Sequence, residues 1–321
     1  MMEYSDRHCR YLWRLISKNA WVYTEMVVSG AILHGNRPRF LDFHRKEHPI
    51  ALQIGGSNPQ ELAECAKIAE QWGYDEVNLN CGCPSDRVQN NQIGAILMRD
   101  SALVAECVAA MKAACDIPVT VKHRIGVDEL DQFEHMAKFV ETVADSGCET
   151  FIVHARKAWL QGLSPKENRE VPPLNYPAVY ELKQLFPQLE IILNGGLCSL
   201  EDCQESLKHV DGVMVGREAY SNPFLLREVD EKLYQSPKRH LTREEVFACY
   251  LDYCREEVEQ GTKIHHLSKH VLGLFNGLPG ARQFRRYISE NVHKPGASVE
   301  TLWQAFGLLG QHEQQQARSA K

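Results

Sequence analysis

The stretch Asn78-Leu79-Asn80-Cys81-Gly82-Cys83-Pro84-Ser85 decides how the rest of the chain is interpreted. Residues 76–79 have strand character and lead directly into it, and Gly82 and Pro84 then end the strand. A thiol where a buried strand opens into a loop is well placed for chemistry, because loops on a rigid scaffold carry many catalytic groups. The stretch therefore predicts a functional cysteine at the end of this strand.

The two cysteines of this stretch are expected to differ in role. Side chains two positions apart on extended backbone point the same way, although Gly82 and Pro84 distort that geometry. A free thiol has a pKa of about 8.5, so at neutral pH it can act as a general acid as well as a nucleophile. We expect Cys83, in a polar loop between Gly and Pro, to be functional and Cys81 to be a small buried residue.

Seven short apolar runs alternate with amphipathic stretches over the first 235 residues. The runs are rich in Val and Ile and nearly continuous in hydrophobicity, which is typical of strands buried on both faces. They cover residues 21–27, 50–54, 76–80, 119–123, 150–154, 190–193 and 212–215. The β-α-β repetition predicts an α/β fold with a parallel sheet, and this many units favours a (β/α)8 TIM barrel.

Such a barrel needs eight strands, and the sequence supplies seven. The chain opens with Met1-Met2-Glu3-Tyr4 and passes directly into a helix-like segment at residues 7–16. We therefore expect the first strand to be missing or truncated.

Helices between the strands have recognisable ends. Asn58 and Pro59 begin one that ends at Gly73, and Ser199 begins another with Asp202 at its third position. These signals support the alternation of strands and helices.

A helical segment with a different composition follows residue 235. Thr242-Arg243-Glu244-Glu245 is typical of a capping box, and an apolar helical stripe follows it. Residues 262–298 contain a single acidic residue, Glu290, against six lysines and arginines and four histidines. We predict two domains, a catalytic barrel at residues 1–235 and a helical domain with a basic face at residues 236–321.

Composition excludes several classes of protein. The 321 residues are 44% hydrophobic and 24% charged, as in globular chains. The net charge of −6 gives no bulk attraction to nucleic acid, so any such role depends on a local patch. No run approaches about 18 apolar residues and the first residues do not resemble a signal peptide, so we expect no membrane span and a cytoplasmic location.

The eleven cysteines are scattered along the chain. None forms a C-x-x-C pair, so the cysteine half of a zinc-finger motif is absent from the sequence. We expect neither a disulfide framework nor a structural metal.

Polar, cationic and glycine residues stand at the ends of most predicted strands, where barrel enzymes place their chemistry. They are Gln53, Asn80, Cys83, Lys122, Arg124, His154, Asn194, Gly195, Gly196, Gly216 and Arg217. The residues after the last two strands fit a phosphate site, because glycines let backbone N–H groups approach an anion and the arginine adds charge.

Lys122 has two functional interpretations. It can form a Schiff base, as in lysine aldolases. It can also hold positive charge beside a cofactor ring and stabilise the reduced, anionic form. The aldolase interpretation leaves Cys83 unexplained.

Several motifs, in this order along the chain, resemble the tRNA-dihydrouridine synthases. They are the run at residues 78–85, Val121-Lys122-His123-Arg124-Ile125-Gly126, His154-Ala155-Arg156, Asn194-Gly195-Gly196 and Val215-Gly216-Arg217. The stretches at residues 154–160, 162–169 and 277–283 look like subfamily A of that family. The resemblance covers essentially the whole chain.

The resemblance implies an oxidoreductase that reduces uridine to dihydrouridine in the tRNA D-loop. The family uses FMN reduced by NADPH, with hydride passing to C6 of the uracil. Cys83 would deliver a proton to C5 from the opposite side. Subfamily analogy favours positions 20 and 20a, and we expect a monomer.

The resemblance also implies roles for individual residues. Residues expected to hold FMN are Gln53, Lys122, His154, Asn194, Gly195, Gly196, Gly216 and Arg217. Asn80 would touch the substrate nucleotide, and Lys166, Arg169, Arg282 and Arg285 would contact tRNA. Family members carry a first strand whose end lies against the flavin, so we also expect this chain, as it stands, to retain FMN poorly.

Two other functions fit parts of the sequence. One is a flavin barrel that reduces a free pyrimidine, for which the basic helical domain has no use. The other is a tRNA-binding protein without catalysis, which the missing strand makes conceivable.

Overall fold

The computed structural model describes residues 1–85, 92–237 and 241–319, which form two compact units. One unit consists of residues 1–5 and 21–216, and the other of residues 6–20 and 217–321. The long segment of the second unit begins at residue 217, before the predicted domain boundary at 235/236. Residues 6–20 and 217–235 pack with the helices of the second unit rather than with the sheet.

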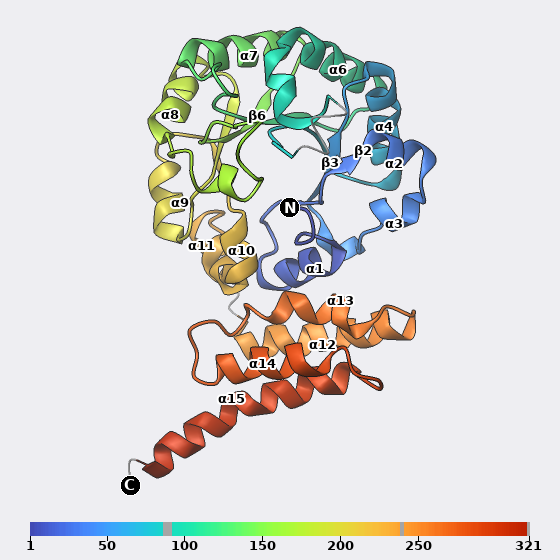
Figure 1. The fold of residues 1–321 in the computed structure, drawn as a ribbon, viewed down its shortest axis with the longest axis vertical. Helices are drawn as coiled ribbons and strands as arrows, with labels where there is room; N and C mark the ends of the chain where they lie inside the picture. Colours follow the sequence, from blue (N-terminus) through green and yellow to red (C-terminus); the bar gives the residue numbers. More distant parts are fainter. Residues whose placement is uncertain (86–91, 238–240, 320–321) are drawn as a thin grey trace. The chain divides into compact units, whose positions relative to one another are not determined.

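The first unit is a curled, entirely parallel sheet (Figure 1). Its strands run in the order β1 (Val22–Tyr23), β3 (Ile50–Gly55), β4 (Glu76–Cys81), β5 (Val119–Arg124), β6 (Thr150–His154), β7 (Glu190–Asn194) and β8 (Gly212–Met214). The short strand β2 (Val27–Val28) also pairs with β3. The predicted parallel α/β architecture is confirmed.

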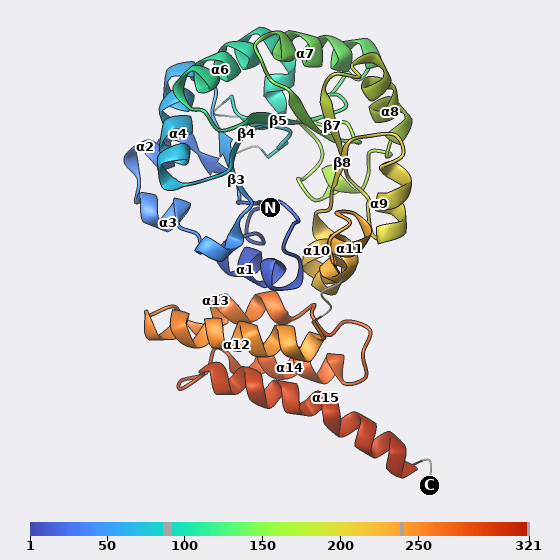
Figure 2. The ribbon, with the colours of Figure 1, turned by 180° about the vertical axis from the view of Figure 1, so that it is seen from behind.

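Helices cover the outer face of this sheet, as Figures 1 and 2 show from opposite sides. They are α2 (Ser29–His34), α3 (Arg37–Leu41), α4 (Pro59–Trp72), α6 (Ser101–Ala114), α7 (Phe133–Asp145), α8 (Tyr176–Leu185) and α9 (Leu200–Ser206). The unit also contains the short 3-10 helices η1 (Arg45–Glu47), η2 (Gly94–Arg99) and η3 (Glu167–Arg169). The predicted caps are in place: Asn58 accepts from the backbone of α4, and Ser199 and Asp202 form a reciprocal capping box on α9.

The strand predicted over residues 21–27 is not continuous, so that prediction is wrong. It is interrupted between β1 and β2 because the hydroxyl of Thr24 accepts the backbone N–H of Gln53 at 2.9 Å. A side chain thus takes a hydrogen bond of the backbone ladder. Smaller differences are that β7 extends to Asn194 and β8 ends at Met214.

The sheet is open between β8 and β1 among the described residues. Met1 begins a turn, since its carbonyl accepts the N–H groups of Tyr4 and Ser5 at 3.0 Å each. No strand precedes β1 in the part of the chain that the structure describes, which agrees with the expected gap.

The second unit is helical. It contains α1 (Arg7–Ile16), α10 (Arg217–Ser221), η4 (Pro223–Glu228), α11 (Val229–Lys232), α12 (Arg243–Glu259), α13 (Ile264–Ser268), η5 (Lys269–Val271), α14 (Ala281–Asn291) and α15 (Val299–Ser319). Its core includes contacting rings of Phe247, Phe275, Phe284 and Phe306. Thr242 and Glu245 form the predicted capping box on α12. No helix in the described residues is long and apolar enough to span a membrane.

Candidate active site

Strand register brings five predicted site residues to one face of the sheet: Gln53, Asn80, Lys122, His154 and Asn194. Asn80 lies opposite Lys122, and His154 lies opposite Asn194. Gln53 lies opposite Asn78, two positions before Asn80 and therefore on the same face. The sheet thus gathers side chains from β3, β4, β5, β6 and β7 on one surface.

This surface is the inner face of the curled sheet. Residues of the opposite face pack against the helices, as His123 does, with its ring centroid 5.1 Å from that of Phe139 on α7. Burial lowers the pKa of His123 to about 4, so its ring is neutral and belongs to the core. Cys81 is on the same outer face and is fully buried, as predicted.

Cys83 follows β4 on a backbone held by Asn80. The side-chain oxygen of Asn80 accepts the N–H groups of both Gly82 and Cys83 at 3.0 Å. The carbonyl of Cys83 accepts the N–H of Ala95 at 2.8 Å, which ties the loop to η2. The thiol is free and half-buried. Its backbone is fixed while its side chain retains access to solvent.

Lys122 is a half-buried cation without a counter-ion. Burial lowers the pKa of its ammonium to about 8, and the charge of Arg124 acts in the same direction. Among the described residues no protein group accepts a hydrogen bond from Lys122 or forms a salt bridge with it. An uncompensated cation on the inner face fits an anionic or carbonyl-rich ligand.

Arg124 holds the site together, a role that its position at a strand end does not reveal. Its Nε donates to the carbonyl of Gly82 at 2.9 Å, and Nη1 donates to those of Lys157 and Asn168 at 3.1 and 2.9 Å. One buried guanidinium therefore joins the Cys83 loop to the segment after β6. Burial lowers its pKa to about 10, and the charges of Arg169 and Arg156 add to the effect.

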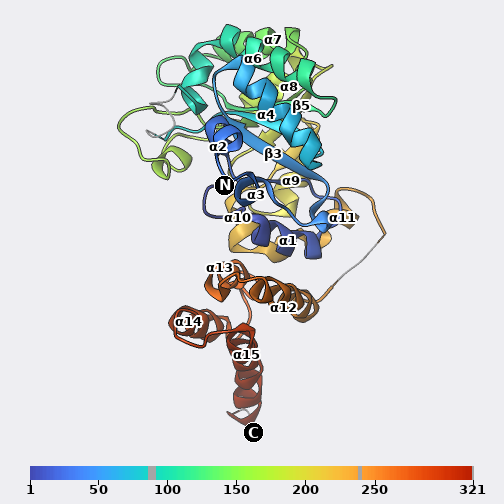
Figure 3. The same cartoon turned by 90° about the vertical axis from the view of Figure 1, so that its right-hand side faces the viewer.

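The segment after β6 is built around Asn168. This buried side chain accepts the N–H of Trp159 at 2.7 Å and donates to the carbonyls of Trp159 and Leu163 at 2.9 and 3.1 Å. In Figure 3 the segment between β6 and α8 projects from one side of the first unit. Lys166, predicted to contact tRNA, is exposed on it, and Arg169 is half-buried.

Gly195 and Gly196 form the turn after β7. Both have positive φ, at 111° and 73°. A Cβ on Gly195 would lie 2.5 Å from the ring of His154, and one on Gly196 would lie 2.4 Å from Leu174. Among the described residues no protein group accepts a hydrogen bond from the N–H of either glycine. These free donors fit a phosphate group.

The last predicted strand end is divided between the two units. Gly216 closes the first unit, where a Cβ would lie 3.6 Å from the sulfur of Met1. Arg217 begins α10 in the second unit, so its predicted phosphate contact stays a prediction from sequence.

Arg282 and Arg285 lie on α14 in the second unit. Arg282 is exposed. Arg285 is half-buried and donates to the side-chain oxygen of Asn276 at 2.6 Å. Their predicted contact with tRNA is compatible with these positions, and it stays a prediction.

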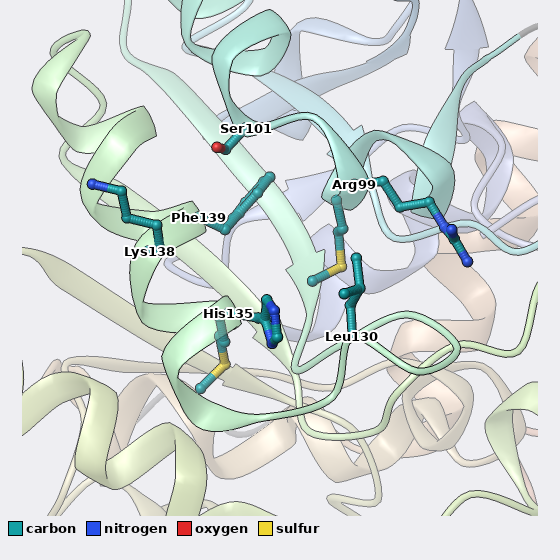
Figure 4. Close-up of a pocket in the computed structure, with 8 residues that line it drawn as sticks. Arg99, Ser101, Leu130, His135, Lys138 and Phe139 are labelled. Atoms are coloured by element: carbon teal, nitrogen blue, oxygen red, sulfur yellow. The ribbon is translucent and has the colours of Figure 1, made fainter.

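The hollow drawn in Figure 4 lies elsewhere in the first unit. It is about 130 Å³ in volume and lies among η2, α6 and α7, lined by Met98, Arg99, Ser101, Leu130, His135, Met136, Lys138 and Phe139. It contains none of the predicted site residues, and we assign it no role.

The inner face also carries polar residues that the strand ends do not include: Glu76, Asn78 and Thr120. The sequence contains a pattern that predicts these residues. Polar side chains recur at every second position, 76, 78 and 80 in β4 and 120, 122 and 124 in β5, within strands that are otherwise apolar. Period-two polarity in a buried strand indicates a polar inner face.

Comparison with known proteins is consistent with this arrangement. The family described as dihydrouridine synthase (Dus) matches residues 1–307. The chain is 56% identical over 314 residues to the tRNA-dihydrouridine(20/20a) synthase of Vibrio cholerae, covering 98% of this chain and 96% of that one. It is 58% identical over 306 residues to the protein of that name from Shewanella oneidensis, with 95% and 91% covered. The corresponding protein of Escherichia coli K12 is 54% identical over 310 residues, with 96% and 90% covered.

Proposed function

The chain belongs to the dihydrouridine synthase family, and on that premise we propose that it reduces uridine to dihydrouridine in the D-loop of tRNA, at positions 20 and 20a. The observation that carries the proposal is the common inner face of the sheet. There Asn80 and an unpaired Lys122 face the same side, next to the half-buried thiol of Cys83.

The residues of this face fit FMN as cofactor and NADPH as reductant. Lys122 and the N–H groups of Gly195 and Gly196 are donors without protein acceptors in the described residues, and FMN offers phosphate and carbonyl oxygens. Gln53, His154, Asn194, Gly216 and Arg217 would complete its binding. When bound and reduced, the flavin supplies hydride to C6 of the uracil.

Cys83 would act as the general acid of the reaction. Addition of hydride at C6 leaves negative charge at C5, so a proton must reach C5 for the reaction to be complete. The thiol of Cys83 would give up that proton and then recover one from solvent. Asn80 and Arg124 hold its loop through Gly82 and Cys83, which keeps the thiol in position.

Access to the base requires tRNA to be held while the uridine leaves its stack. Phosphate contacts supply affinity and orientation without reading sequence. We assign this role to Lys166, Arg169, Arg282 and Arg285.

The dihydrouridine content of tRNA from a strain that lacks the gene tests the proposal. We expect dihydrouridine to disappear at positions 20 and 20a, to return with the wild-type gene and to stay absent with Cys83→Ala. Unchanged dihydrouridine in the deletion strain would refute the proposed reaction. If the deletion strain loses dihydrouridine and Cys83→Ala fully restores it, the acid role of Cys83 alone would be refuted.

A further inference from the structure

Five side chains on the inner face of the sheet form one continuous series of hydrogen bonds, here called the polar ladder. Its members are Asn80, Gln53, Asn78, Thr120 and Glu76. Asn80 donates to Gln53 at 2.9 Å, Gln53 to Asn78 at 2.9 Å, Asn78 to Thr120 at 2.8 Å and Thr120 to Glu76 at 2.6 Å. All five are at least nine-tenths buried, so each of these bonds is shielded from water.

The ladder has a direction that the carboxylate sets. An ionised carboxylate only accepts, so the single hydroxyl proton of Thr120 is committed to Glu76. The oxygen of Thr120 must then accept, which turns the NH2 group of Asn78 toward it. The oxygen of Asn78 is left to accept from Gln53, and Gln53 in turn accepts from Asn80. Each amide thus has one allowed orientation.

The other end of the ladder requires the same direction. The oxygen of Asn80 faces the N–H groups of Gly82 and Cys83, which can only donate. With Asn80 reversed, two backbone donors would face an NH2 group beside the proposed acid. In the observed orientation both lone pairs of the oxygen are used, and Asn80 keeps one N–H free to donate to a carbonyl oxygen of the substrate.

Glu76 is an unusual group to find at the base of the ladder. Its side chain is buried and accepts from Thr120 and also from Tyr23, at 2.8 Å, but no cation in the described residues pairs with it. Burial raises its pKa to about 6, its two hydrogen bonds oppose that shift, and the charge of Glu190 on β7 adds to it. A buried carboxylate that is ionised at neutral pH without a counter-ion opposes folding, which suggests that its charge serves the site.

We propose that Glu76, Thr120 and Asn78 are positioning residues for uridine reduction: through Gln53 they fix the orientation of Asn80, and thereby the loop of Cys83 and the donor that faces the substrate. The inference rests on the proposed function, because it assigns these residues to the reaction in which Cys83 is the acid.

The first test is the single-turnover rate of uridine reduction in tRNA by the flavin-loaded protein. Thr120→Val keeps the shape of the side chain but breaks the ladder, and we expect the rate to fall about tenfold. Thr120→Ser restores the hydroxyl and should recover most of the rate. Thr150→Val is the matched control, because Thr150 also donates to a carboxylate, that of Glu190 at 2.7 Å, but is not part of the ladder.

Glu76→Gln provides a second readout that a purely structural role would not give. Removing the buried charge should raise the melting temperature at pH 8 while lowering the rate several-fold, because an amide no longer enforces the direction of the ladder. The wild-type rate should also fall as the pH drops through about 6, and this fall should be absent in Glu76→Gln.

The outcomes separate the ladder from the proposed function. A Cys83→Ala protein that reduces uridine at the wild-type rate would overturn the acid role of Cys83 on which the inference rests, and a wild-type protein that reduces no uridine in tRNA would overturn the proposed function itself. If the Cys83→Ala protein is inactive while the Thr120→Val and Glu76→Gln proteins turn over like the wild type, the positioning role of the ladder alone would be overturned. Failure of Thr120→Ser to recover more rate than Thr120→Val would also overturn it.

Discussion

The Nε of Arg124 donates to the carbonyl of Gly82 at 2.9 Å, one residue before the proposed acid Cys83. The same guanidinium bonds two carbonyls of the segment after β6, so three backbone positions depend on one buried side chain. We predict that Arg124→Lys lowers the rate of uridine reduction by about 10- to 100-fold, since an ammonium cannot reproduce the planar fork.

Single-turnover rates at saturating tRNA would measure this effect. Arg99→Lys is the control, because Arg99 pairs with Asp128 and Glu129 through an exposed side chain. Equal rates for Arg124→Lys and Arg99→Lys would show that the fork of Arg124 is not needed.

Gly195 offers a test of the proposed phosphate site. Gly195→Ala should lower flavin affinity at least about tenfold, because a Cβ at a φ of 111° would displace the ring of His154. Gly162→Ala is the control for backbone strain. Gly162 has a φ of 82°, but a Cβ there would meet nothing within 4 Å, so this variant has the strained backbone without a steric clash. Flavin titration by fluorescence should find Gly162→Ala close to wild type, and similar affinities for both variants would argue against the site.

Lys122 should reduce the stability of the protein at neutral pH. Its pKa falls from 10.5 to about 8 on folding, so the unfolded chain binds more protons between these values and stability rises with pH across that window. We therefore predict that Lys122→Met melts higher than wild type at pH 7 and that the difference shrinks as the pH rises from 8 toward 10.5.

The control for Lys122 is Lys138→Met, at an exposed lysine paired with Glu141. Thermal melts of both variants and the wild type at several pH values would measure how the difference in melting temperature changes with pH. A Lys122→Met protein that melts below wild type at pH 7 would contradict the assignment of an unpaired, desolvated cation.

Asp6 should stabilise the helical unit. Burial raises the pKa of this carboxyl, but the hydrogen bonds and charges of His270 and Lys269, at 2.8 and 2.9 Å, outweigh that and leave it well below its usual range. A lowered pKa contributes stability that is present above the unfolded value of 3.8 and is lost as the pH falls below it. Asp6→Asn keeps the cap on α1 but removes the charge, so we expect a loss of about 3 kcal/mol at pH 7.

Denaturant unfolding at pH 7 and at pH 3 checks the sign of this effect. The difference between Asp6→Asn and wild type should shrink at the lower pH. Asp252→Asn, in an exposed pair with Arg255, is the control and should cost less than about 1 kcal/mol. A difference for Asp6→Asn that is equal at both pH values would point to packing rather than charge.

Local signals predicted much of the fold. The helix at residues 7–16 and the caps at Asn58, Ser199 and Thr242 are found where the sequence places them, because each depends on residues within a few positions. The interruption after Tyr23 was not predictable in this way, since it depends on a bond between Thr24 and Gln53, 29 positions apart.

The site was predicted less completely than the fold. Strand ends identified the neighbourhood of Lys122 and His154, since parallel strands end at one edge. The joining role of Arg124 and the direction of the polar ladder depend on which atom of each side chain faces which partner. That information arises only when the strands are in register.

Oxidation of pre-reduced, protein-bound flavin by tRNA, followed in the absence of NADPH, tests the central claim most directly. We predict rapid oxidation with stoichiometric dihydrouridine in the wild type, and a rate at least about 100-fold lower in Cys83→Ala with flavin and tRNA binding unchanged. Equal rates in the two proteins, or flavin oxidation without dihydrouridine, would contradict the account.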